Sequence, residues 1–186
     1  MKNLLAILFF LPCLLLAQHD QMIEEIDDDR DYNVIQTGNN TISLQAYNNI
    51  KINGVSLKII QNFEGSSAAL STLLRTTFTQ EKPDPEAINF TSTNLVLAYG
   101  NVTSDWILYY LEFLNSNVTL NILGKTVKLG DDISLLGFGT NLKSRLIAES
   151  GERSAIFCSD LDSSYTAVRF DPITKKITKI YYLSPT

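Results

Sequence analysis

Apolar and polar residues alternate on either side of a tight turn signal near residue 53. Asn53-Gly54 suits a two-residue hairpin turn of type I′, which needs positive φ at both central positions. Pairing outward from this turn places apolar residues opposite one another: Ile52 faces Val55, and Ile50 faces Leu57. We therefore expect the stretch 50–59 to form a β-hairpin that is apolar on one side and polar on the other.

The same pattern returns 70 residues later, in the stretch 120–129. The apolar pairs of this second hairpin are Leu120 with Val127, and Val118 with Leu129. Leu123-Gly124 is a poorer turn than Asn53-Gly54, because a branched side chain is disfavoured at positive φ. The two stretches agree in pattern more than in letters, and we interpret them as copies of one unit.

Helical spacing follows each hairpin. After the first hairpin, apolar residues at 70, 73 and 74 share one helical face, and Ser66 or Ser67 can serve as N-cap. After the second hairpin, Asp131 or Asp132 can cap a helix with apolar residues at 133, 135 and 136. Gly137 and Gly139 would shorten this second helix, because each costs about 1 kcal/mol relative to alanine.

Strand-like runs complete the two copies. They cover 95–99, 106–114, 118–122, 154–158, 165–170 and 177–183. The run 106–114 looks equivalent to 165–170, because the two share a Leu-Glu-Phe or Val-Arg-Phe ending. The segment 83–94 carries Pro83 and Pro85 and is expected to be a loop. We therefore predict an α+β fold in which tandem repeats 41–116 and 117–186, each a β-hairpin, a helix and antiparallel strands, form a mainly antiparallel sheet with helices on one face.

This order of elements resembles the tandem α+β repeats of the beta-lactamase-inhibitor-like proteins and of small lipoproteins of outer-membrane assembly. The openings 52–74 and 122–136 carry the resemblance, together with the closing strands Leu-Glu-Phe…Val-Thr-Leu (111–120) and Val-Arg-Phe…Ile-Thr-Lys-Ile (168–180). It implies binding modules without catalysis, in which the open face of the sheet meets a partner, and it suggests an accessory role in envelope assembly. The chain lacks the paired cysteines that often staple the inhibitor repeats.

The first 17 residues have the order of a removable export signal. Lys2 precedes an apolar run from residue 4 to residue 16, and the small Ala17 precedes Gln18. About 14 apolar residues reach only ~21 Å, which is short of the roughly 30 Å hydrocarbon core. A lipoprotein signal ending at Cys13 is the alternative, although Pro12 stands where a small residue is expected. We expect cleavage near Ala17, a secreted or periplasmic protein, and no transmembrane segment afterwards.

Acidic residues concentrate directly after this signal. Residues 20–31 hold seven acidic residues and Arg30, a net charge of −6, whereas the chain from residue 32 onward has 13 acidic and 13 basic residues. Such a block repels itself, so we interpret residues 18–40 as an acidic, disordered leader. A calcium loop is not expected, because Gly38 occupies the position that needs a bidentate glutamate.

No set of residues specifies a reaction. The sole histidine, His19, falls in the leader, and Cys158 is the sole cysteine after the signal, where a small buried hydrophobe is its expected role. The sequence therefore predicts no catalytic residue, no cofactor and no metal site. A glycan hydrolase is the alternative, and its carboxylates would come from Asp105, Glu112, Asp131, Asp132, Asp160 and Asp162.

One strand face invites a binding role. On strand 106–114, residues Ile107, Tyr109, Leu111 and Phe113 form the more apolar side and are expected in the core. The opposite side would then present Trp106 and Tyr110, joined through the repeat by Tyr165 and Arg169, the residue types that dominate interface energetics. We expect a non-catalytic binding protein whose partner is another protein or an envelope component. Nucleic acid is not expected, because no basic cluster exceeds Lys175-Lys176-Lys179.

Overall fold

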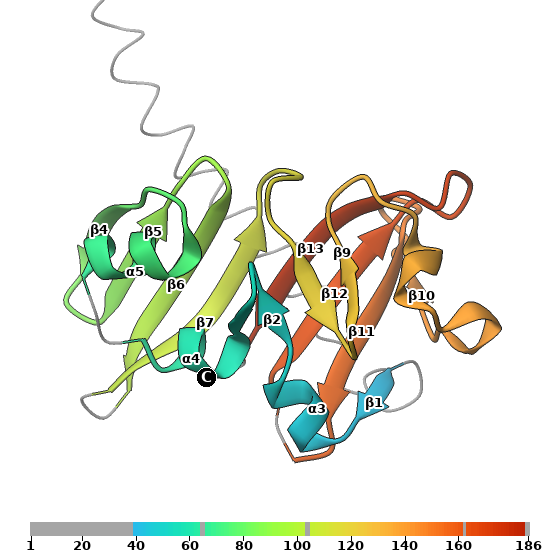
Figure 1. The fold of residues 1–186 in the computed structure, drawn as a ribbon, viewed down its shortest axis with the longest axis horizontal. Helices are drawn as coiled ribbons and strands as arrows, with labels where there is room; N and C mark the ends of the chain where they lie inside the picture. Colours follow the sequence, from blue (N-terminus) through green and yellow to red (C-terminus); the bar gives the residue numbers. More distant parts are fainter. Residues whose placement is uncertain (1–38, 64–65, 103–104, 162, 185–186) are drawn as a thin grey trace, which may run out of the picture. The chain divides into compact units, whose positions relative to one another are not determined.

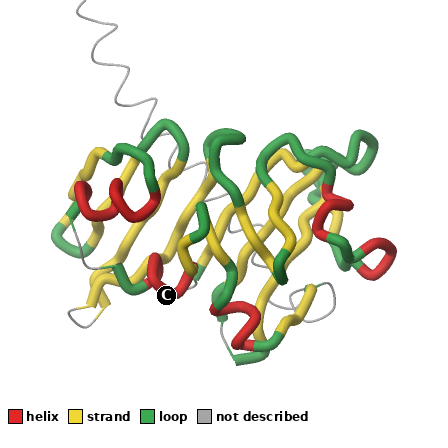
Figure 2. The backbone as a smooth tube through the Cα atoms, in the orientation of Figure 1, coloured by secondary structure: helices red, strands yellow, loops and turns green. Residues whose placement is uncertain are grey.

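A computed structural model describes residues 39–63, 66–102, 105–161 and 163–184 of the chain. The expected export signal and residues 18–38 of the expected leader lie outside these described residues. The last two residues assigned to the disordered leader are placed wrongly, because Asn39 and Asn40 are buried and Asn40 begins a strand. The described chain combines a large, mainly antiparallel sheet with short helices (Figures 1 and 2). This confirms the α+β class and the mainly antiparallel sheet. Within the described residues, no helix combines the length and the apolar character that crossing a bilayer requires.

The larger sheet has the strand order β1-β11-β12-β13-β7-β6-β5-β4, and β10 pairs with β11. Its strands are β1 (Asn40–Ile42), β4 (Thr79–Asp84), β5 (Ala87–Thr91), β6 (Leu95–Val102), β7 (Asp105–Phe113), β10 (Arg145–Leu146), β11 (Arg153–Ser159), β12 (Tyr165–Phe170) and β13 (Ile177–Leu183). Neighbouring strands run antiparallel except β1, which pairs with β11 in the parallel sense. The chain therefore enters the larger sheet at an edge, through β1.

The two expected hairpins form a second, smaller sheet of order β3-β2-β8-β9. Its strands are β2 (Lys51–Ile52), β3 (Val55–Ser56), β8 (Leu120–Ile122) and β9 (Lys125–Val127). The inner expected pair of each hairpin is confirmed, since Ile52 faces Val55 and Leu120 faces Val127. The outer pairs, Ile50 with Leu57 and Val118 with Leu129, lie outside these strands. The hairpins also pair with each other through β2 and β8, where Ile52 lies opposite Leu120. Two stretches 70 residues apart in the sequence are thus neighbours in one sheet.

The helices are shorter than the sequence pattern suggests. They are α3 (Leu44–Asn48), α4 (Leu57–Gln61), α5 (Ser67–Leu74) and the 3-10 helices η2 (Ile133–Leu136) and η3 (Gly139–Asn141). The expected caps are present: Ser66 Oγ accepts from Ala69 N at 3.3 Å, and Asp132 Oδ1 accepts from Ser134 N at 2.8 Å. Gly137, at φ 76°, ends η2 after one turn. Residue 57, expected in a strand, instead begins α4.

The expectation of a loop over 83–94 was wrong. Strands β4 and β5 cross this segment, and Ile88 and Phe90 of β5 point into the core. Pro83 lies on β4, the edge strand of the larger sheet, where a missing N–H need not break a ladder of hydrogen bonds. Pro83 therefore lies in an edge strand and Pro85 in the turn that follows it. The alternating apolar residues Ile88 and Phe90 predict strand β5 better than the prolines predict a loop.

The runs 106–114 and 165–170, expected to be equivalent, do not occupy equivalent positions in the larger sheet. Strand β7 lies beside β13 in the middle of the larger sheet, whereas β12 lies one strand further toward the β1 edge. Strands β7 and β12 therefore occupy different places.

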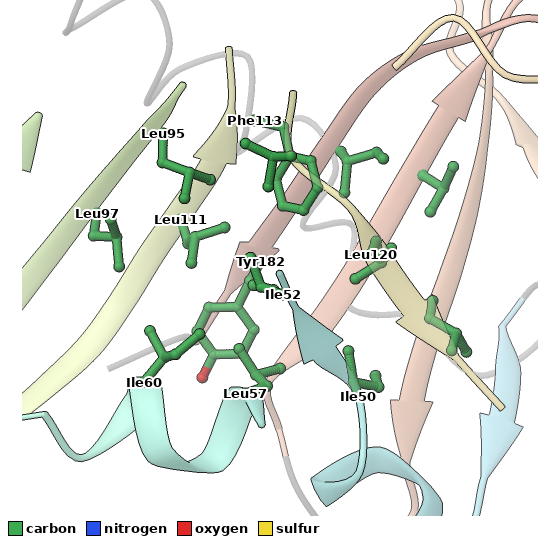
Figure 3. Packing of buried hydrophobic residues seen from close by; sticks show 14 of the residues in the cluster. Ile50, Ile52, Leu57, Ile60, Leu95, Leu97, Leu111, Phe113, Leu120 and Tyr182 are labelled. Atoms are coloured by element: carbon green, nitrogen blue, oxygen red, sulfur yellow. The ribbon is translucent and has the colours of Figure 1, made fainter. Parts of the chain in front are cut away.

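One hydrophobic cluster joins the smaller sheet, the helices and one side of the larger sheet. Figure 3 shows Ile52 of β2 and Leu120 of β8 packed near Leu111 and Phe113 of β7. Apolar residues of α3, α4 and α5 belong to the same cluster. In Figure 1 the hairpins are drawn over the strands of the larger sheet, in agreement with these contacts. We call this side of the larger sheet the core face.

The turn of the second hairpin offers a stability test. Leu123 has φ 51° and a side chain that is half exposed, so it meets the steric cost of the left-handed region, about 1–2 kcal/mol for a branched L-residue. Leu123→Asn is expected to raise the free energy of unfolding by about 0.5–1 kcal/mol in urea denaturation, because asparagine tolerates this conformation.

Asn53 supplies the matched control at the same turn position of the first hairpin, with φ 50°. Its side chain also accepts from Thr119 N at 3.0 Å and donates to Leu74 O at 3.2 Å. Asn53→Leu should therefore destabilise the protein by more than Leu123→Asn stabilises it. A loss of stability in Leu123→Asn would show that backbone strain does not govern this turn.

Candidate binding face

Three of the four predicted interface residues share one face of the larger sheet. Tyr110 of β7 lies opposite Leu183 of β13, which in turn lies opposite Tyr165 of β12. Arg169 lies four residues after Tyr165 on the same strand, so side-chain alternation puts it on the same side. The intervening core-face residues of these strands belong to the hydrophobic cluster. We call the opposite side, which carries Tyr110, Glu112, Tyr165, Arg169, Lys179 and Tyr181, the rear face.

Trp106 does not belong to the rear face, and its predicted position was wrong. Ala98 pairs with Tyr110, but the next residue, Tyr99, pairs with Leu108, so Tyr109 is an extra residue in β7. Such a β-bulge shifts side-chain alternation by one position. Trp106 therefore packs against the hydrophobic cluster on the core face.

The same bulge corrects the predicted core of this strand. Leu111 and Phe113, which follow the bulge, are in the cluster as expected. Ile107 precedes the bulge and falls on the rear side, opposite Gly100, while Leu108 takes its place in the core. Tyr109, also expected in the core, is the bulge residue and is only partly buried.

Tyr181 lies at the centre of the rear face and connects the predicted residues. Its ring meets the ring of Tyr165 edge-on, with centroids 6.2 Å apart and an interplanar angle of 74°. The guanidinium carbon of Arg169 lies 5.5 Å from the Tyr181 ring centroid, and Lys179 Nζ lies 5.7 Å from it. Both distances are within the range of cation–π attraction. Arg169 and Lys179 also face each other across β12 and β13, so two cations share one aromatic ring.

Glu112 supplies the negative charge among these residues. Tyr110 Oη donates a hydrogen bond to Glu112, and Lys179 Nζ lies 3.5 Å from Glu112 Oε1. Burial raises the pKa of Tyr110 far above its usual range, and the neighbouring Glu112 carboxylate raises it further. The phenol of Tyr110 is therefore neutral at physiological pH and acts as a donor.

Sequence reasoning missed Tyr181 and Lys179. The sequence did contain a signal for them, because Lys179, Tyr181 and Leu183 are every second residue of the strand run 177–183 and so share one side of it. Lys179 and Tyr181 have long or large side chains that can reach residues on the adjacent strands. The expectation of an open face was wrong in a further respect: Tyr165, Arg169 and Tyr110 are only 3%, 5% and 6% exposed, and Tyr181 is fully buried.

Groups with reactive potential are not assembled into a site in the described chain. Within it, no three His, Cys, Asp or Glu side chains are placed to hold a metal ion. Burial raises the pKa of the Cys158 thiol, which is partly buried as a small hydrophobe would be. Hydrogen bonds from backbone and side chains lower the pKa of the Asp132 and Asp171 carboxyls at two turns. Neither has the raised pKa that a glycosidase acid needs.

A separate hollow lies on the core face near the other end of the larger sheet. It has a volume of about 340 Å³, and its lining includes Trp106, Phe90, Tyr99 and Lys82. Tyr99 Oη is committed inside the protein, donating to Ile60 O at 2.7 Å. Trp106 is thus part of an aromatic hollow distinct from the rear face.

The chain matches neither a protein-family model nor a curated protein. Among solved structures it is similar to the crystal structure of a cysteine-rich secretory protein from Staphylococcus aureus, with 14% sequence identity and a TM-score of 0.31. The similarity covers 63% of this chain and 41% of that protein. The chain therefore spans less than half the length of that protein, and a likeness of this degree carries no argument about fold or function.

Proposed function

We propose that this chain is an exported, non-catalytic binding protein that holds another protein on its rear face. The observation that carries the proposal is the convergence of Tyr110, Tyr165 and Arg169 around Tyr181. Tyrosine and arginine are among the residues that contribute most to the binding energy of protein interfaces. The sheet also holds them rigidly, so little conformational entropy is lost on binding.

The chemistry of the rear face favours a partner with carboxylates beside apolar side chains. Lys179 is partly exposed and is the cation that the rear face can present, while Arg169, only 5% exposed, lies beside it against the Tyr181 ring. No proton transfer is assigned to these groups: the raised pKa of Tyr110 keeps it from acting as a base near neutral pH, and Glu112 is paired with Lys179. Binding is thus the role that these contacts support.

We further propose that the fold is a duplication of one α+β unit, with copies 41–116 and 117–186. The neighbouring hairpins support this, since β3-β2 and β8-β9 meet in mirrored order. In the larger sheet, β5-β6-β7 meets β13-β12-β11 in the same mirrored way. The rear-face residues lie where the two halves of the larger sheet join, so the proposed binding surface is built from both copies.

Affinity capture from the native envelope or medium tests the binding role. We expect the double variant Arg169→Gln and Lys179→Gln to lose partner capture by at least about tenfold, because both charges beside the aromatic floor are removed. The matched control removes two exposed lysines of other elements, Lys58→Gln and Lys82→Gln, and should capture the partner normally. Equal capture by both double variants, with unchanged melting temperatures, would show that the partner does not bind the rear face.

A further inference from the structure

A second hollow lies on the core face, apart from the aromatic hollow that Trp106 lines. Its volume is about 390 Å³, and its lining includes residues of β11, β12, η2 and η3. The apolar part of the lining consists of Ile133, Phe138, Leu142 and Phe170, which belong to the hydrophobic cluster or pack against it. Small-molecule sites have this size and a mainly apolar lining with a few polar groups. We call this feature the Arg153 hollow, after the cation in its lining.

The guanidinium of Arg153 is half-buried and held in one orientation. Its Nε donates to Ser144 Oγ at 2.8 Å, and its Nη2 donates to Ser144 O at 2.5 Å. Among the described residues, no carboxylate forms an ion pair with Arg153. The edge formed by Nη1 and Nη2 still carries N–H groups beyond the two that Ser144 accepts, and a carboxylate can accept two parallel hydrogen bonds from such an edge.

The backbone that orients Arg153 is itself fixed by strand β1. Asn40 Nδ2 donates to Lys143 O at 2.9 Å, and Lys143 N donates to Asn40 Oδ1 at 3.0 Å. Asn40 Nδ2 also donates to Ile156 O on β11 at 3.1 Å, which ties this loop to the strand that carries Arg153. Ser144 follows Lys143 directly, so the hydrogen bonds of Asn40 also restrain the two acceptors of Arg153. A guanidinium fixed in this way loses little conformational entropy when it binds an anion.

The charges around the Arg153 hollow leave one positive charge uncompensated. Lys175 lines the hollow from the turn between β12 and β13, and Ile133 N donates to Lys175 O at 2.9 Å, which ties this turn to η2. Asp132 is the one acidic residue among the described residues of the lining. Hydrogen bonds from Ser134 hold the pKa of the Asp132 carboxyl below its usual range, so it stays ionised and offsets Lys175. The charge of Arg153 therefore remains for a ligand.

We propose that the Arg153 hollow binds a small organic acid, with its carboxylate on the Nη1–Nη2 edge of Arg153 and its apolar group against Phe138 and Phe170. A single carboxylate matches the one uncompensated positive charge. The rings of Phe138 and Phe170 favour an aromatic group, which can pack edge-on or offset against them. This site lies on the core face, so it is separate from partner binding on the rear face and does not depend on it.

Titration of the chain that begins at Gln18 with benzoate, followed by amide NMR shifts, tests this inference. We expect saturable shifts at Phe138, Gly139 and Leu142, with a Kd on the order of 1 mM or tighter. Benzyl alcohol keeps the ring without the charge, and inorganic phosphate keeps a charge without the ring. Each should bind at least about tenfold more weakly than benzoate, because each lacks one of the two contacts.

Substitution of Arg153 shows whether its guanidinium holds the carboxylate. Arg153→Gln should weaken benzoate binding by at least about tenfold, and Arg153→Lys should weaken it less, because lysine keeps the charge but cannot offer two parallel donors. The matched control is Lys82→Gln, which removes the cation beside the aromatic hollow and should leave the Kd unchanged.

The comparison of the three ligands uses the unaltered protein, so it decides the question even if an Arg153 variant does not fold. Absence of saturable shifts around the Arg153 hollow would overturn the inference. Phosphate or benzyl alcohol binding as tightly as benzoate would also overturn it. Benzoate binding that depends on Lys82 and not on Arg153 would place the anion in the aromatic hollow and contradict the assignment.

Discussion

Leu120→Ala is expected to lower the free energy of unfolding by about 2–5 kcal/mol, and Ile52→Ala by a similar amount. Both side chains are buried in the hydrophobic cluster, and they lie opposite each other where the two hairpins pair. Removing either one leaves a cavity between the smaller and the larger sheet (Figure 3). Urea denaturation of the single variants measures the two losses.

The double variant shows whether the hairpins depend on each other. Residues in contact share one cavity, so the combined loss should differ from the sum by about 0.5–3 kcal/mol. Pairing Leu120→Ala with Ile88→Ala provides the control, because Ile88 lies on β5, which does not pair with β8. This control pair is expected to be close to additive. Full additivity of Ile52 and Leu120 would contradict their packing as a unit.

Tyr181→Ala is expected to destabilise the protein by about 3–5 kcal/mol, as for other large buried aromatic residues. The ring is fully buried and contacts Tyr165, Arg169 and Lys179, so its removal empties the centre of the rear face. Tyr181→Phe keeps the ring and should cost only about 1 kcal/mol. Thermal and urea unfolding measure both changes. A cost below about 1 kcal/mol for Tyr181→Ala would mean that the ring is exposed in solution.

The hairpins could be predicted because turn chemistry and alternation agree there. Asn53-Gly54 specifies its turn, and a period of two then sets which residues face each other. The helices were less predictable. Helices α3 and α4 each contain only five residues, which is too few for helical periodicity to stand out. Their position depends on packing against the sheets.

The errors in the larger sheet have physical causes that no local pattern reveals. Pro83 argued for a loop, but the strand that contains it lies at an edge, and edge position depends on the whole topology. The bulge at Tyr109 reverses the alternation in the first half of β7 and moves Trp106 to the core face. The amino-acid composition around Tyr109 does not distinguish a strand with a β-bulge from a regular strand.

The candidate site was predicted in part. Tyr110 and Arg169 were assigned to one face through a repeat alignment of β7 with β12, yet the sheet brings them together through β13. The residues between them, Tyr181 and Lys179, follow from the alternation of that strand once its neighbours are known. Burial of the rear face could not be inferred from these strands, because it depends on what covers them.

Photocrosslinking in the native envelope or medium tests most directly whether the rear face binds a partner. A benzophenone side chain would replace Lys179 on the rear face or, as the matched position, Lys82 beside the core-face hollow. We predict that intermolecular adducts with one protein form from position 179 and not from position 82. Adducts from position 82 alone, or from neither position, would contradict the account.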